Sequence, residues 1–157
     1  MEILKGHHTG LTVRSIVKSI AFYRDLLGMH LVFSWSPNAP YIGEVTGYRN
    51  AEFNIAVLKV PQVDFFIELL EYKNVEQITI DHRNGNPGIA HIAFQVDNLD
   101  QWFQFLRSKG VSSVSSPVTP TAGPNRGGRL VYMIDPDGYR VELIETSKAF
   151  TEFLPED

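Results

Sequence analysis

The chain of 157 residues is 43% hydrophobic and 20% charged, the composition of a folded globular protein long enough to bury a sizeable core. Its 14 Lys and Arg against 18 Asp and Glu give a net charge of −4, so it has no basic surface of the kind that binds nucleic acid or an anionic membrane. The absence of cysteine excludes disulfides, thiolate nucleophiles and cysteine-ligated metal sites. With no apolar run that could cross a membrane and no secretory leader, we expect a cytoplasmic protein without membrane or nucleic-acid partners.

The first half predicts a strand, a helix and then three strands. The opening strand carries Leu11 and Val13, and a helical stripe over 19–27 follows it and ends at Gly28. Segments typical of strands then cover 29–35, 53–59 and 65–71, with a short extended piece near 41–42.

The second half repeats this order. A strand is expected over 91–96 and a helix over 100–109, which ends at Gly110. Three strands are expected after it, over 111–115, 129–134 and 139–145. The sequence therefore predicts one domain over 1–157, made of module 1 (about 4–72) and module 2 (about 88–146), which a polar linker over 73–87 joins.

The alternation of side chains along a strand sorts the polar residues onto two faces. Because the apolar residues of the first strand in each half must cover the helix, His8 and His91 point to the opposite face. The same alternation along the last strand of each half places Glu68 and Glu142 on that opposite face. Three other candidates fall on the helix side: His7, Glu71 and Glu145.

Two His–Glu pairs that recur with the internal repeat indicate a metal site. A single His near the start of a strand is ordinarily solvated, but a carboxylate within an apolar strand is costly unless it is neutralised or binds a metal. Two imidazoles and two carboxylates without a thiolate suit a divalent ion of intermediate hardness, and Zn²⁺, Ni²⁺, Co²⁺, Mn²⁺ and Fe²⁺ all fit. His30 and His82 lack such support and are predicted as surface or loop residues.

Five segments carry a family resemblance: His8-Thr9-Gly10-Leu11-Thr12-Val13, Phe22-Tyr23-Arg24-Asp25-Leu26-Leu27-Gly28-Met29, Ile67-Glu68-Leu69, Gly88-Ile89-Ala90-His91-Ile92-Ala93-Phe94-Gln95-Val96-Asp97 and Asp135-Pro136-Asp137-Gly138-Tyr139-Arg140-Val141-Glu142-Leu143-Ile144-Glu145. In this order they resemble the vicinal oxygen chelate superfamily over nearly the whole chain. The resemblance implies an α+β fold of two tandem βαβββ modules, whose curved mixed sheets form a metal-binding cavity. It also implies four metal ligands, His8, Glu68, His91 and Glu142.

The resemblance further implies a metal-dependent isomerase or lyase, similar to glyoxalase I or methylmalonyl-CoA epimerase. The ion would chelate neighbouring oxygens of a small substrate, and Glu142 or Glu68 would move a proton next to a carbonyl. One alternative is an extradiol-type dioxygenase, which holds Fe²⁺ by two His and one Glu, and the extra Glu68 counts against it. A second alternative is a protein that sequesters a drug-like ligand, although such members typically lack the metal residues.

Thr12 is a departure from the family pattern. Bacterial glyoxalase I proteins that this chain resembles carry an Arg four residues after the first His, where it holds the glutathione carboxylate. The sequence therefore leaves open whether glutathione or CoA takes part. The predicted substrate-binding residues are Thr12, Phe66, Gln95, Arg126, Arg129 and Arg140. The superfamily builds its cavity within one chain or across a dimer interface, and we expect a homodimer.

Overall fold

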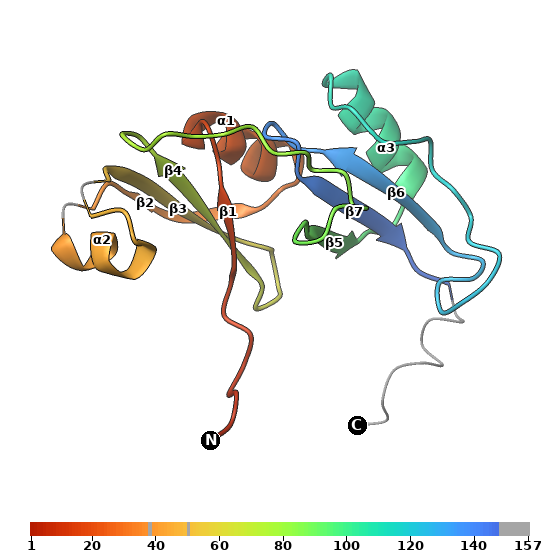
Figure 1. Cartoon of the computed structure of the whole chain (residues 1–157). Helices are drawn as coiled ribbons and strands as arrows, with labels where there is room; N and C mark the ends of the chain where they lie inside the picture. Colours follow the sequence, from red (N-terminus) through yellow and green to blue (C-terminus); the bar gives the residue numbers. More distant parts are fainter. Residues whose placement is uncertain (38, 50, 148–157) are drawn as a thin grey trace. The chain divides into compact units, whose positions relative to one another are not determined.

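The computed structural model describes residues 1–37, 39–49 and 51–147, and the chain divides after Thr79 into two compact units, each with its own mixed sheet (Figure 1). Unit 1 contains four strands, β1 (Thr9–Thr12), β2 (His30–Trp35), β3 (Phe53–Lys59) and β4 (Phe66–Tyr72), in the order β1-β4-β3-β2. Unit 2 contains β5 (His91–Gln95), β6 (Arg129–Ile134) and β7 (Arg140–Glu145), in the order β5-β7-β6. In each unit the first strand runs parallel to the last, and the other pairings are antiparallel. The predicted α+β class with two mixed sheets is confirmed.

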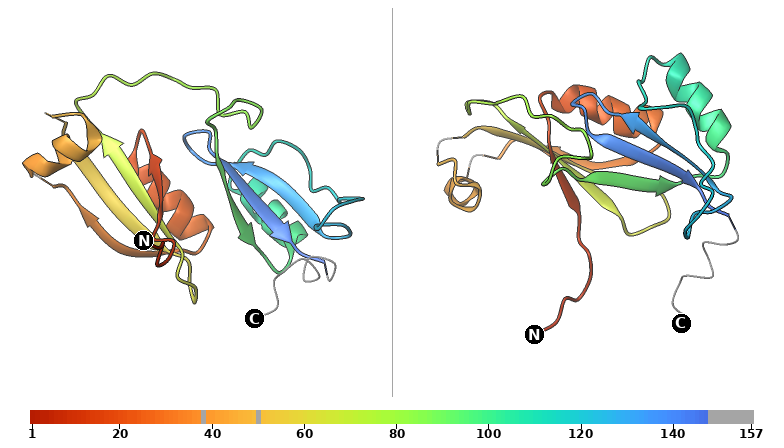
Figure 2. Two further views of the ribbon diagram at one scale, coloured as in Figure 1. Left: turned by 60° about the horizontal axis from the view of Figure 1, so that its bottom comes forward. Right: turned by 45° about the vertical axis from the view of Figure 1, so that its right-hand side comes forward.

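Each sheet is covered on one face by a helix of its own unit (Figure 2). In unit 1 the helix α1 (Ile16–Ile20) continues into the π-helical turn η1 (Ala21–Leu26), and in unit 2 the helix is α3 (Leu99–Ser108). The first helix begins earlier than predicted, because the Ser15 side chain accepts a hydrogen bond from the Lys18 N–H and caps it. No helix in the described part of the chain has the length and apolar character needed to cross a bilayer.

The predicted extended piece near 41–42 is wrong, because these residues belong to the helix α2 (Pro40–Thr46). Pro40 occupies the start of the helix, where its fixed backbone angle suits the first turn. Gly47 ends the helix with a φ of 80°, which glycine adopts without strain. Pro40 and Gly47 thus set the bounds of a helix where the two apolar residues Tyr41 and Ile42 predict an extended piece.

The strand predicted over 111–115 is also wrong. This segment follows β6 only through isolated bridges, which join Ser113 to Met133 and Val118 to Leu130. Pro117 lies between the two bridges and has no N–H to donate, so a continuous ladder cannot form there.

The core of each unit lies between the sheet and its helix, as strand alternation predicts. The fully buried side chains of the strands include Ile67, Leu69, Val131, Met133, Val141 and Leu143, and the helices contribute Tyr23, Leu99 and Leu106. Because Ile67, Leu69, Val141 and Leu143 face the helix of their unit, the carboxylates that alternate with them, Glu68 and Glu142, lie on the other face.

Glu145 lies on the helix side of β7 and has a structural role. Its Oε2 accepts a hydrogen bond of 2.8 Å from the backbone N–H of Leu99, the first residue of α3. A carboxylate at this position satisfies a free N–H and interacts favourably with the helix dipole.

Replacing Glu145 with alanine is expected to lower the free energy of unfolding by about 1–2 kcal/mol, because the first N–H of α3 loses its charged acceptor. Urea denaturation followed by circular dichroism would measure the change. The matched control is Glu44→Ala, at an exposed position on α2, which should alter stability by less than about 0.5 kcal/mol. Equal stability of the Glu145 variant and the parent would contradict the capping role.

Candidate metal centre

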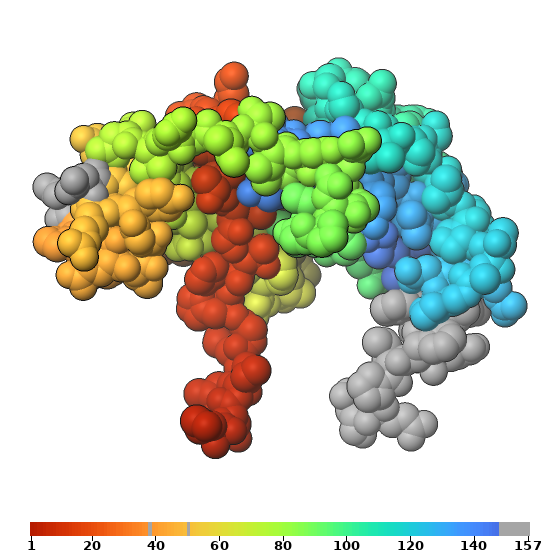
Figure 3. All heavy atoms as spheres, viewed as in Figure 1, coloured from red at the N-terminus to blue at the C-terminus, as the bar shows by residue number. Residues whose placement is uncertain are grey.

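The first predicted ligand pair lies on the helix-free face of unit 1. Glu68 of β4 pairs with Gly10 of β1 on one side and with Val57 of β3 on the other. His8 precedes Gly10 by two residues, and its Nε2 lies 3.3 Å from Glu68 Oε2. The two Nδ1 atoms of His7 and His8 are 2.7 Å apart, so one of them carries the shared proton and His8 directs its Nε2 at Glu68. The segment before this pair, red in Figure 3, extends away from the body of the unit.

The second pair has the same design in unit 2. Glu142 of β7 pairs with Ala93 of β5 and with Tyr132 of β6. His91 precedes Ala93 by two residues, and its Nε2 lies 3.1 Å from Glu142 Oε2. The Glu142 side chain is 10% exposed, whereas that of Glu68 is 26% exposed, so the second carboxylate is the more enclosed.

Tyr132 accounts for part of that enclosure, and sequence reasoning missed it. Its ring stands edge to face against His91 with the centroids 5.2 Å apart, and its hydroxyl lies beside the side chains of Asn84 and Glu142. Burial, and then the negative charge of Glu142, raises the pKa of the phenol above its usual value. The tight turn between β6 and β7 sets the register that brings Tyr132 opposite Glu142, so the turn sequence was a usable signal. Nothing in the sequence pointed to Asn84.

The spacing within each pair fits two ligands of one ion. Two donor atoms each about 2.1 Å from a metal, at angles of about 90–110°, lie about 3.0–3.4 Å apart. The separations of 3.3 Å and 3.1 Å fall in that range. Within the described residues, neither unit gathers three His, Asp or Glu side chains that could hold a metal ion. Each pair is therefore short of the three or four protein ligands typical of such ions.

Four of the predicted substrate-binding residues share a face with a ligand pair. In unit 1 these are Thr12, which is exposed and pairs with Leu70, and Phe66, two residues before Glu68. In unit 2 they are Gln95 and Arg140, and the latter pairs directly with a predicted ligand. Strand alternation thus places all four beside the candidate centre of their own unit.

The other two predicted substrate-binding residues, Arg126 and Arg129, do not share a sheet face with a ligand pair. Arg129 lies on the helix side of β6, where both terminal guanidinium nitrogens bind the Asp100 carboxylate at 2.7 and 2.8 Å. Arg126 lies exposed in the loop before β6. Of the two histidines predicted as surface or loop residues, His30 is exposed on β2, and His82 lies half-buried in the loop before β5.

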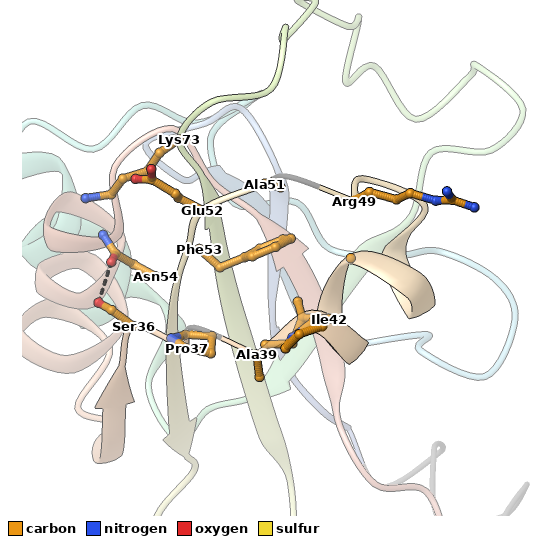
Figure 4. Close-up of a pocket in the computed structure, with 12 residues that line it drawn as sticks. Ser36, Pro37, Ala39, Ile42, Arg49, Ala51, Glu52, Phe53, Asn54 and Lys73 are labelled. Atoms are coloured by element: carbon orange, nitrogen blue, oxygen red, sulfur yellow. Dashed lines mark hydrogen bonds between the residues drawn. The ribbon is translucent and has the colours of Figure 1, made fainter.

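A cavity of about 670 Å³ lies at the far end of the unit 1 sheet, between α2 and the start of β3 (Figure 4). Phe53 points toward the helix that carries Ile42, and Ser36 Oγ donates a hydrogen bond of 2.6 Å to Asn54 Oδ1 (Figure 4). Phe53 is four residues from Val57, which pairs with Glu68, so about 13 Å of strand separates the cavity from the ligand pair. The cavity is therefore distinct from the candidate metal centre.

Comparisons with known proteins match most of the chain. A family model described as the glyoxalase/bleomycin resistance protein/dioxygenase superfamily matches residues 5–143, a span that contains both His–Glu pairs. A lactoylglutathione lyase from Salmonella typhimurium is 36% identical over 145 residues, which cover 90% of this chain and 93% of the relative. A 2-epi-5-epi-valiolone epimerase from Actinomyces sp. is 30% identical over 142 residues, covering 88% of this chain and 77% of the relative.

Solved structures show the same fold. A glyoxalase family protein from Bacillus cereus superimposes with a TM-score of 0.78 at 23% identity, covering 93% of this chain and 96% of that protein. Glyoxalase I from Leishmania major superimposes with a TM-score of 0.63 at 22% identity, covering 88% of this chain and 84% of that protein.

Proposed function

Because the chain belongs to the glyoxalase/bleomycin resistance protein/dioxygenase superfamily, we propose that it is a metal-dependent isomerase or lyase of the glyoxalase type. Its relatives named as a lyase and an epimerase make it an enzyme of the glyoxalase family. The observation that carries the proposal is the recurrence of one His–Glu pair at the same register position in both sheets. This set of four donors supports an isomerase or lyase over an extradiol dioxygenase, which needs only three.

His8, Glu68, His91 and Glu142 would together hold one divalent ion, with Zn²⁺, Ni²⁺, Co²⁺, Mn²⁺ and Fe²⁺ all compatible with the donors. When bound, the ion supplies a Lewis acid that polarises the oxygens of a small substrate.

The protein's own contribution to the reaction is proton movement by a carboxylate. Glu142 or Glu68 takes the proton from the carbon next to a substrate carbonyl, and the electron pair of that C–H bond moves to the carbonyl oxygen. In an isomerisation, the resulting carboxylic acid returns the proton to the former carbonyl carbon, while the proton of the neighbouring hydroxyl moves to the oxygen that received the electron pair. In an epimerisation, the other carboxyl group delivers its own proton to the opposite face of the same carbon, and the electron pair returns from the oxygen to re-form the carbonyl.

Deuterium exchange tests this proposal directly. The protein is loaded in turn with each of the five metals and incubated in deuterated buffer with 2-hydroxycarbonyl compounds, acyl-CoA thioesters and the glutathione adducts of 2-oxoaldehydes. Proton NMR then follows loss of the C–H signal next to the carbonyl. We expect exchange that requires metal and is lost on chelation. A protein that binds none of the metals and exchanges no substrate would overturn the proposal.

Thr12 decides whether a glutathione adduct is a good substrate. It is exposed on the face of Glu68 and offers a hydroxyl but no charge. Replacing Thr12 with arginine is expected to lower KM for the glutathione adduct by about 10- to 150-fold, because a charge-assisted hydrogen bond is worth about 1.5–3 kcal/mol. Steady-state kinetics would measure it, with Thr12→Gln as the uncharged control of similar length. An unchanged KM in the arginine variant would show that residue 12 does not determine whether a glutathione adduct is accepted as substrate.

A further inference from the structure

We propose that Tyr132 is the positioning residue of the second His–Glu pair and holds the Glu142 carboxylate and the His91 ring in the arrangement in which they bind a metal ion. The inference rests on the proposed function, and it assigns a role to a residue outside the four ligands.

The contacts of Tyr132 reach both members of the pair. Its backbone pairs with Glu142 across β6 and β7, and its hydroxyl interacts with the Glu142 carboxylate. The edge-to-face contact with His91, with ring planes at 85°, limits the rotation of the imidazole. A carboxylate has two oxygens, so the phenol and an ion can occupy it at the same time. A single side chain thereby restrains both ligands.

Asn84 in turn restrains Tyr132. Its side chain lies beside the phenol, and it comes from the loop that precedes β5 rather than from the sheet. The chain of contacts runs from Asn84 to Tyr132, then to Glu142 and finally to His91, whose Nε2 is 3.1 Å from the carboxylate. Ligands supported in this way are preorganised, and loss of such a support typically weakens metal binding by about 10- to 100-fold.

The first pair lacks the equivalent support. Val57 occupies the register position that corresponds to Tyr132 and has no hydrogen-bond donor in its side chain. The restraint in unit 1 acts on the histidine instead, through the contact between His7 and His8. Glu68 is therefore the less restrained carboxylate, and the second pair is the preorganised half of the centre.

The test measures metal affinity rather than turnover. The full-length protein is stripped of metal and titrated with Co²⁺ in competition with a chromophoric chelator, and the visible absorption of the bound Co²⁺ is recorded. For Tyr132→Phe we expect a Kd about 10- to 100-fold higher than that of the parent, together with a shifted Co²⁺ spectrum. For Asn84→Ala we expect a smaller loss of affinity in the same direction.

The matched control is Tyr41→Phe in unit 1. Tyr41 lies exposed on α2, outside the sheet, and does not pair with a predicted ligand. Its Kd should stay within about twofold of the parent. Parental affinity and spectrum in both Tyr132→Phe and Asn84→Ala would overturn the positioning role while leaving the proposed function standing. A parent protein that binds no ion would overturn both.

Discussion

Replacing Glu142 with glutamine is expected to lower kcat by about 10²- to 10⁴-fold, the contribution typical of a positioned general base. The amide preserves the size of the side chain and one oxygen, but it does not accept a proton from carbon. Glu142 is the more enclosed of the two candidate carboxylates, so bulk water competes least with the substrate there. The measurement is kcat together with deuterium exchange, in enzyme whose metal content has been matched to that of the parent.

Two further variants make this result specific. Glu145→Gln changes a carboxylate on the same strand but on the opposite face, where the amide oxygen can still accept the Leu99 N–H, so parental turnover is expected. Glu68→Gln tests the other candidate base. Parental turnover in Glu142→Gln would remove Glu142 from the role, and a large loss in Glu68→Gln alone would assign the proton transfer to Glu68.

Strand alternation was enough to select the four candidate ligands from the sequence, because the face toward the helix had to be apolar. Ile67 and Leu69 are fully buried, which turns Glu68 between them to the other face. The same logic would have excluded Arg129, since it alternates with the buried Val131 and Met133 and therefore lies on the helix side. The prediction that Arg129 binds substrate took account of its charge but not of its position on the strand.

Residues that depend on contacts between distant segments could not be found in this way. Asn84 lies in the stretch predicted as a polar linker, and only the folded loop brings it to Tyr132. The pairing of Asp100 with Arg129 likewise joins a helix to a strand 29 residues further along. The helix α2 was missed for another reason, because the prediction considered only the apolar residues Tyr41 and Ile42 and not the starting and ending signals at Pro40 and Gly47.

The double variants His8→Ala/Glu142→Ala and His8→Ala/Glu68→Ala should both lose bound metal, with affinity reduced more than about 100-fold, beyond the loss typical of a support residue. The first removes one ligand from each pair. The second removes the first pair entirely and leaves His91 and Glu142 at their separation of 3.1 Å. Elemental analysis of protein purified without an affinity tag, followed by Co²⁺ titration, would measure both.

The second variant separates two models of the centre. If one ion needs both pairs, the remaining pair supplies only two protein ligands, and the ion leaves because such ions typically have three or four. If each pair held an ion of its own, His8→Ala/Glu68→Ala would keep half of the parental metal at parental affinity. That result would contradict a shared centre and would assign a separate ion to each His–Glu pair.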